Sequence, residues 1–174
     1  MNKFLPFVLL TFALKVFADI PNILVVTEHR PPFNYLSDKG EIIGSATKQV
    51  KQSLEKANLK YQIKLMPWAR AYNLALSKQN VLIYSIIKTP ERENKFHWFC
   101  PLTKPLSFSF FGLANKKKLS VKSLDEAKTY STGVINSDYS HEFLKDLGFN
   151  DNKELDVSFS SDTIVKKLYN HRID

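Results

Sequence analysis

Residues 84–96 read YSIIKTPERENKF, a stretch that joins the end of an apolar run to a charged turn. The apolar run from Val81 to Ile87 predicts a buried parallel strand, since such strands are apolar on both faces. It leads into a polar turn that carries Arg92. The guanidinium of an arginine offers a planar fork of donors that fits a carboxylate in bidentate geometry. Arg92 is therefore a candidate anion-binding residue, with a surface side chain in a helix-opening turn as the alternative.

The residues before this stretch alternate between strand and helix patterns. Residues 23–26 form a short apolar run, and residues 61–65 alternate apolar with polar side chains, as in a half-buried strand. Between these two strands, apolar residues recur at helical spacing and predict a first helix. Pro67, after the second strand, opens a second helix. The order β-α-β-α-β predicts a parallel sheet with right-handed crossovers.

A second α/β unit is expected to begin near residue 106. Residues 107–113 predict a long aromatic strand, and shorter strands are expected at 133–135 and around 157–159. Helix starts are indicated by Ser123, by the run Asn136-Ser137-Asp138 and by the pair Ser161-Asp162. The composition shift at residues 101–105 indicates a hinge, so the predicted fold is two α/β lobes, residues 19–105 and 106–174. Ligands bind in the cleft between such lobes.

The first 18 residues have the three parts of a secretory leader. They comprise a short start with Lys3, an apolar run over residues 4–14, and a small residue, Ala18, before the expected cleavage point. An uncleaved anchor is the alternative, although the apolar run is short for a bilayer span. We expect Asp19 to be the first residue of the mature, exported protein.

Composition argues against several function classes. The net charge of +8 is scattered apart from Lys116–Lys118, which is more typical of a solvated loop. There is no aromatic-basic RNA motif and no zinc-finger spacing, so we do not expect a nucleic-acid partner. The four histidines form no metal-binding motif, so no metal is expected. The single cysteine, Cys100, cannot form an internal disulfide, and we expect it to be a buried thiol rather than a nucleophile.

Four motifs in order carry a family resemblance. They are ILVVTEHRPPFNY at residues 23–35, YQIKLMPWARAYNLAL at 61–76, VLIYSIIKTPERENKFHW at 81–98 and GVINSDYSHEF at 133–143. This order resembles the family 3 extracellular solute-binding proteins, the periplasmic amino-acid-binding proteins of ABC importers. The resemblance implies a type 2 periplasmic-binding-protein-like fold, a periplasmic location, a monomer without cofactor and delivery of ligand to an ABC permease in the inner membrane. The segment from Pro67 to Ala71 is similar to a subgroup whose ligands are poorly defined.

The resemblance also implies ligand-binding residues in the first lobe. Arg92 matches the arginine that grips the ligand carboxylate, and Ser85 matches a strand-end position that helps to hold the ligand. Thr89 lies between them and adds a hydroxyl. Arg30 stands where family members often place an aromatic residue that covers the ligand. That departure points to an anionic ligand or to a pocket that does not bind a standard amino acid.

The predicted site is completed by Asn136, Ser137, Trp68 and Tyr35. Asn136 and Ser137, together with Asp138, occupy the turn before a helix of the second lobe, where backbone N–H groups form a physically reasonable anion site. Trp68 either lines the cleft or packs between elements of its own lobe. Tyr35 is a further pocket candidate.

Three functions are compatible with this sequence. We expect a non-enzymatic protein that binds a small polar solute, an amino acid or similar carboxylate, for an importer. The alternatives are a sensory or vestigial exported domain, and an enzyme on the same scaffold, which would need a buried acid–base pair. Arg172-Ile173-Asp174 resemble the start of the strand that completes the second lobe in the family. The second lobe is therefore expected to be incomplete, as a partial record or as a natural truncation.

Overall fold

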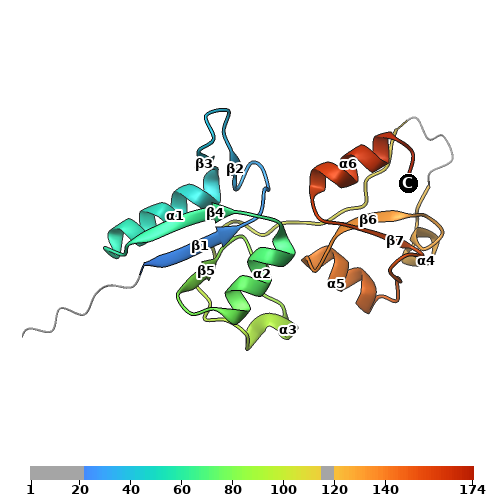
Figure 1. Cartoon of the computed structure of the whole chain (residues 1–174). Helices are drawn as coiled ribbons and strands as arrows, with labels where there is room; N and C mark the ends of the chain where they lie inside the picture. The colour runs from blue at the N-terminus through green and yellow to red at the C-terminus, as the bar shows by residue number, and fades with distance from the viewer. Residues whose placement is uncertain (1–21, 115–119) are drawn as a thin grey trace, which may run out of the picture.

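The computed structural model describes residues 22–114 and 120–174 (Figure 1). The predicted leader, residues 1–18, and the cluster Lys116–Lys118 lie outside these ranges. The described residues form two groups of helices and strands, here called lobe 1 and lobe 2, which are joined by residues 99–114 (Figure 1). Within the described ranges, no helix has both the length and the apolar character needed to cross a membrane.

Lobe 1 is built on a parallel sheet with the strand order β4-β1-β5. The central strand β1, Ile23–Thr27, pairs with β4, Tyr61–Leu65, and with β5, Val81–Ile83. The helices α1, Ser45–Lys56, and α2, Trp68–Ser77, cover opposite faces of this sheet (Figure 1). The predicted parallel β-α-β-α-β order is confirmed, although β5 ends four residues before the predicted end of the apolar run.

The core of lobe 1 explains why these segments fold as they do. Val25 of β1 packs with Ala46, Val50 and Leu54 from one face of α1, and Tyr84 closes the cluster. A small hairpin of β2, Tyr35–Leu36, and β3, Ile42–Ile43, precedes α1. The strands of this hairpin are only two residues long, too short to show an alternation of apolar and polar residues in the sequence.

Lobe 2 contains a two-stranded parallel sheet of β6, Thr132–Ile135, and β7, Leu155–Ser158. Its helices are α4, Leu124–Ala127, α5, Tyr139–Asp146, and α6, Ser161–Tyr169. The side chains of Ser123, Asp138 and Ser160 each accept a backbone N–H at the start of these helices. The cap at residue 123 matches the prediction, and Asp138 lies within the predicted run 136–138. The last helix is capped by Ser160, one residue earlier than expected.

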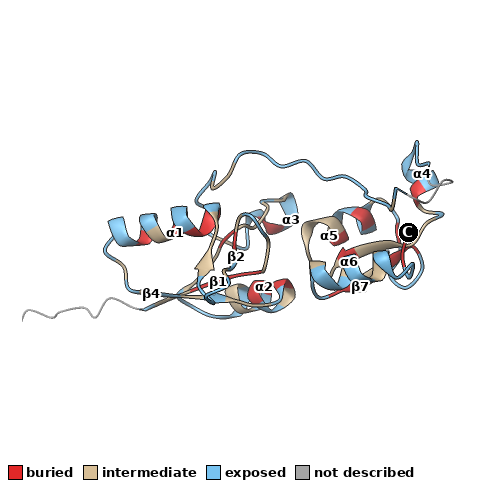
Figure 2. Ribbon diagram, turned by 90° about the horizontal axis from the view of Figure 1, so that it is seen from above, coloured by how far each residue is buried: buried red, intermediate tan, exposed pale blue. Residues whose placement is uncertain are grey.

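The connection between the lobes differs from the prediction. Across the described residues 99–114 there is no helix or strand, so the expected aromatic strand at 107–113 is wrong. Aromatic residues favour strands only where a neighbouring strand pairs with them, and none does here. The segment runs exposed between the lobes (Figure 2), with Phe99 and Phe111 88% and 83% exposed. Cys100 is also exposed, which contradicts its expected burial.

Candidate functional site

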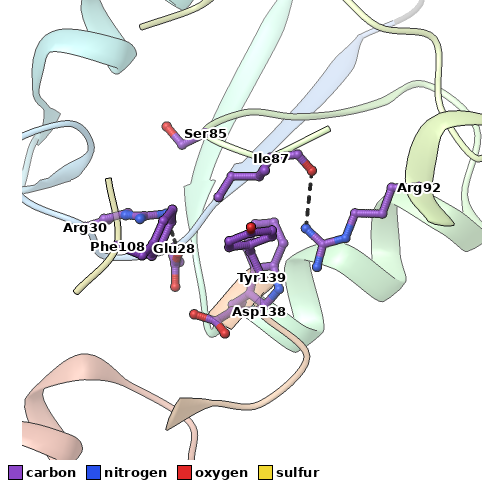
Figure 3. A pocket seen from close by; sticks show the side chains of 9 residues that line it. Glu28, Arg30, Ser85, Ile87, Arg92, Phe108, Asp138 and Tyr139 are labelled. Atoms are coloured by element: carbon purple, nitrogen blue, oxygen red, sulfur yellow. Dashed lines mark hydrogen bonds and ion pairs between the residues drawn. The ribbon is translucent and has the colours of Figure 1, made fainter. Parts of the chain in front are cut away.

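A pocket lies where lobe 1, the connecting segment and the start of α5 meet (Figure 3). Its cavity volume is small, about 10 Å³, and the pocket is partly open to solvent. Polar, charged and aromatic side chains contribute to its wall, which consists of Glu28, Arg30, Trp68, Ser85, Ile87, Arg92, Phe108, Asp138 and Tyr139. Because both lobes contribute residues, a change in the distance between the lobes changes the shape of the pocket.

Arg92 is held deep inside the protein by the short helix α3, Pro90–Glu93. Only 1% of the residue is exposed, so the alternative of a surface arginine is wrong. Its guanidinium carbon lies 5.6 Å from the ring centre of Trp68 and 5.1 Å from that of Tyr72. Both distances permit cation–π attraction, which helps to keep the charge in a buried position.

The hydrogen bonds of Arg92 connect the two lobes. Nη2 donates to Oε2 of Glu142 at 2.6 Å and to the carbonyl oxygen of Ser137 at 3.3 Å. Nη1 donates to the carbonyl oxygen of Ile87 at 3.5 Å (Figure 3). The buried Nε–H has no acceptor among the described residues. The Glu142 carboxylate thus occupies part of the donor fork that was predicted for a ligand carboxylate.

Ser85 lies at the pocket wall because the chain bends sharply after β5. Its φ angle of 60° is unusual for a residue other than glycine. Its hydroxyl donates to Oδ1 of the fully buried Asn34 at 2.6 Å, and Nδ2 of Asn34 donates to the carbonyl oxygen of Glu28, also at 2.6 Å. Ser85 therefore fixes the backbone of Glu28 through Asn34.

Glu28 is a buried acid directly after β1, with 7% of the residue exposed. Nη1 of Arg30 approaches its Oε1 to 3.9 Å, a distance at which an ion pair has no hydrogen bond. Burial raises the pKa of Glu28 to about 7; the charge of Arg30 opposes this rise, and that of Asp138 adds to it. This pKa places the carboxyl group close to half ionised at neutral pH.

Three aromatic side chains shape the pocket beside these charges. The guanidinium of Arg30 lies 5.8 Å from the ring centre of Phe108, and the rings of Phe108 and Tyr139 are 5.0 Å apart. Trp68 is buried at another part of the wall, and its Nε1 donates to the carbonyl oxygen of Ser137 at 2.6 Å. The connecting segment thus contributes a ring that packs between the two lobes.

The turn before α5 presents a carbonyl group to lobe 1. Ser137 has a φ angle of 58°, and its N–H donates to Nδ1 of His141 at 3.0 Å. The N–H of His141 donates to Asp138, and Nε2 of His141 bonds to Asp151. The N–H groups of Asn136 and Asp138 are also bonded within the protein. The N–H groups of all three turn residues are thus used within the protein, and anion binding at this turn stays a prediction.

The pocket brings together four of the eight predicted ligand-binding residues. Arg92, Ser85, Trp68 and Arg30 line it. The others lie outside its wall: Thr89 is the N-cap of α3, Tyr35 belongs to β2, and Asn136 and Ser137 form the turn described above. Contact of any of these residues with a ligand stays a prediction.

The remaining wall residues were not predicted as ligand-binding residues. Glu28 carried a usable signal, because it follows a parallel strand, and the carboxyl ends of such strands are where ligands bind. Asp138 was noted only as part of the turn. Phe108 and Tyr139 carried no local signal, since their place depends on how the lobes meet.

Comparison with known proteins identifies the family. A profile of the bacterial extracellular solute-binding proteins, family 3, matches residues 23–167. The chain belongs to this family. The predicted resemblance is therefore confirmed, and the protein has the general character of a solute-binding protein. No curated protein sequence matches the chain.

Solved structures agree with this family at the level of the fold. An ancestral arginine-binding protein bound to arginine has a TM-score of 0.70 at 20% identity, over 88% of this chain and 67% of that chain. The arginine-, lysine-, histidine-binding protein ArtJ from Geobacillus stearothermophilus gives 0.66 at 21% identity, over 88% and 65%. A histidine kinase sensor domain with similarity to periplasmic binding proteins gives 0.67 at 15%, again over 88% and 65%.

The solved structures confirm the predicted type 2 periplasmic-binding-protein-like fold. This family member spans about two thirds of their length. Identities near 20% show a shared fold alone.

Proposed function

We propose that this protein binds a small polar solute, an amino acid or similar carboxylate, between its lobes and delivers it to the permease of an ABC importer. The observation that carries the proposal is Arg92, a buried cation at the pocket wall whose Nε–H has no protein acceptor in the described chain. A buried N–H without an acceptor is costly, and a ligand oxygen would satisfy it. Export by the predicted leader to the periplasm is part of the same proposal.

The contacts between the lobes also support binding by closure. Ser137 accepts hydrogen bonds from Trp68 and Arg92, and Glu142 pairs with Arg92. These contacts are polar and few, as expected for lobes that separate and close around a ligand.

A sensory role is the second candidate. The fold is shared with a histidine kinase sensor domain, so the same closure would serve to report a ligand rather than to deliver it. Uptake of labelled ligand by cells that carry or lack this gene discriminates the two roles. Loss of uptake supports delivery, whereas unchanged uptake with a lost transcriptional response supports sensing.

The binding site is tested with Arg92→Lys. A lysine keeps the positive charge but cannot offer a planar fork, so we expect the affinity for the bound solute to fall by at least about tenfold. Candidate amino acids and related carboxylates are screened by thermal shift, and affinities are then measured by calorimetry. Arg70→Lys, the same change at an exposed position of α2 outside the pocket wall, is the matched control. Equal affinities of the two variants would contradict the role of Arg92.

A further inference from the structure

The Glu28 carboxylate faces the pocket without a hydrogen-bond donor. Its side chain is 9% exposed, and no residue of the described chain donates a hydrogen bond to it; the nearest cation is the Arg30 guanidinium at 3.9 Å. A buried carboxylate normally accepts several hydrogen bonds, because burial otherwise penalises its charge. A ligand with N–H donors that enters the pocket would supply hydrogen bonds to the Glu28 carboxylate.

The charges around the pocket leave an excess of negative charge. Arg92 is paired with Glu142 at 2.6 Å, so its charge is already compensated within the protein. What remains at the wall is Glu28 and Asp138 against the single cation Arg30. The Asp138 carboxylate is close enough to act on the pKa of Glu28, so the two acids share one electrostatic environment. A ligand with a positive charge would balance this wall.

The shape of the wall suits an organic cation as well. The rings of Phe108 and Tyr139 lie 5.0 Å apart at the pocket, and both line it together with Glu28. Aromatic faces attract ammonium and guanidinium groups, and this attraction strengthens where water is excluded. Carboxylates and rings at one wall thus favour the same ligand group.

We propose that Glu28, supported by Asp138, binds the ammonium or guanidinium group of the ligand. The Glu142 carboxylate then occupies the place on the Arg92 guanidinium where a ligand carboxylate would otherwise bind. The site then takes organic cations whether or not they carry a carboxylate. This inference rests on the proposed solute-binding function and narrows its ligand class. Glu142 acts as a specificity-determining residue, because a ligand carboxylate must compete with it for the same nitrogen.

The test compares three probes by calorimetry on the full chain: arginine, agmatine, which is arginine without its carboxylate, and glutamate. We expect arginine and agmatine to bind with affinities within about tenfold of each other and glutamate to bind more weakly than both. Glu28→Gln should lower the affinity of the protein for arginine and for agmatine by at least about tenfold. Glu41→Gln, which removes an exposed acid in the β2–β3 hairpin, should leave both affinities unchanged.

Glu142→Gln tests the replacement of the ligand carboxylate. Once Arg92 is released from its partner, the affinity for arginine should rise relative to that for agmatine. Tighter binding of glutamate than of agmatine, or cation affinities that do not respond to Glu28→Gln, would overturn the inference while leaving solute binding intact. If neither these probes nor the wider amino-acid panel bind, the proposed function fails and this inference fails with it.

Discussion

Glu28 makes the stability of the protein depend on pH. Its pKa is about 7 in the folded protein, against an ordinary value of 4.5, because burial penalises the charge. As the pH rises from 4.5 to 7, the unfolded chain releases this proton first, so the unfolded state is favoured. We therefore expect this residue to lower the free energy of unfolding by about 3 kcal/mol between pH 4.5 and pH 8.

Glu28→Gln tests this stability effect, since glutamine cannot ionise. The variant should match the parent protein near pH 4.5 and become more stable than it by about 3 kcal/mol at pH 8, as measured by urea unfolding. Glu41→Gln, at an exposed position, should show no such growing difference. A constant offset between Glu28→Gln and the parent at both pH values would show that the carboxyl group titrates normally.

The start of helix α1 holds in place the loop that carries Glu28 and Arg30 of the pocket wall. Gly44 precedes α1 with a φ angle of 122°, and the N–H groups of Ala46 and Thr47 donate to the carbonyl oxygen of Phe33. A Cβ atom at position 44 would lie 2.2 Å from that oxygen. The close approach therefore depends on glycine, and it holds Asn34, which in turn holds Glu28.

Gly44→Ala should separate this loop from the helix. We expect a loss of about 3 kcal/mol in the free energy of unfolding, because the contact is with backbone atoms that have little room to move. The control is Gly40→Ala in the β2–β3 turn, where φ is 77° and nothing lies within 4 Å of the added atom, so the loss should be about 1 kcal/mol. Similar unfolding midpoints for the two variants would argue against a close packing of the loop on α1.

Elements whose own residues encode them were predictable, and contacts between elements were not. Val50 and Leu54 recur at helical spacing and are buried in α1, and the alternation in residues 61–65 matches the exposure of β4. The aromatic run at 107–113 has the composition of a strand, but a strand also needs a partner edge, which no local pattern supplies. Glu142 gains its role only when lobe 2 meets lobe 1, so its sequence neighbourhood suggests an ordinary solvated acid.

Two tryptophans each donate one hydrogen bond, one between the lobes and one within lobe 1, so their variants can be compared to test the contact between the lobes. Nε1 of Trp68 donates across the lobes to the Ser137 carbonyl at 2.6 Å, whereas Nε1 of Trp98 donates within lobe 1 to the Glu93 carbonyl at 2.9 Å. Replacement of either residue by phenylalanine keeps an aromatic ring and removes one donor. Only the Trp68 donor, however, resists separation of the lobes.

Trp68→Phe should therefore shift the protein toward more open forms. A lost hydrogen bond of about 1 kcal/mol changes the ratio of open to closed molecules by about fivefold. The radius of gyration from small-angle scattering should increase in Trp68→Phe and stay unchanged in Trp98→Phe. If the solute binds between the lobes as proposed, it binds the closed form more tightly, and saturating ligand should return the Trp68→Phe value to that of the parent protein. If both variants scatter like the parent without ligand, the bond from Trp68 to Ser137 does not control closure, and the bonds of Arg92 to Ser137 and Glu142 are sufficient to hold the lobes together.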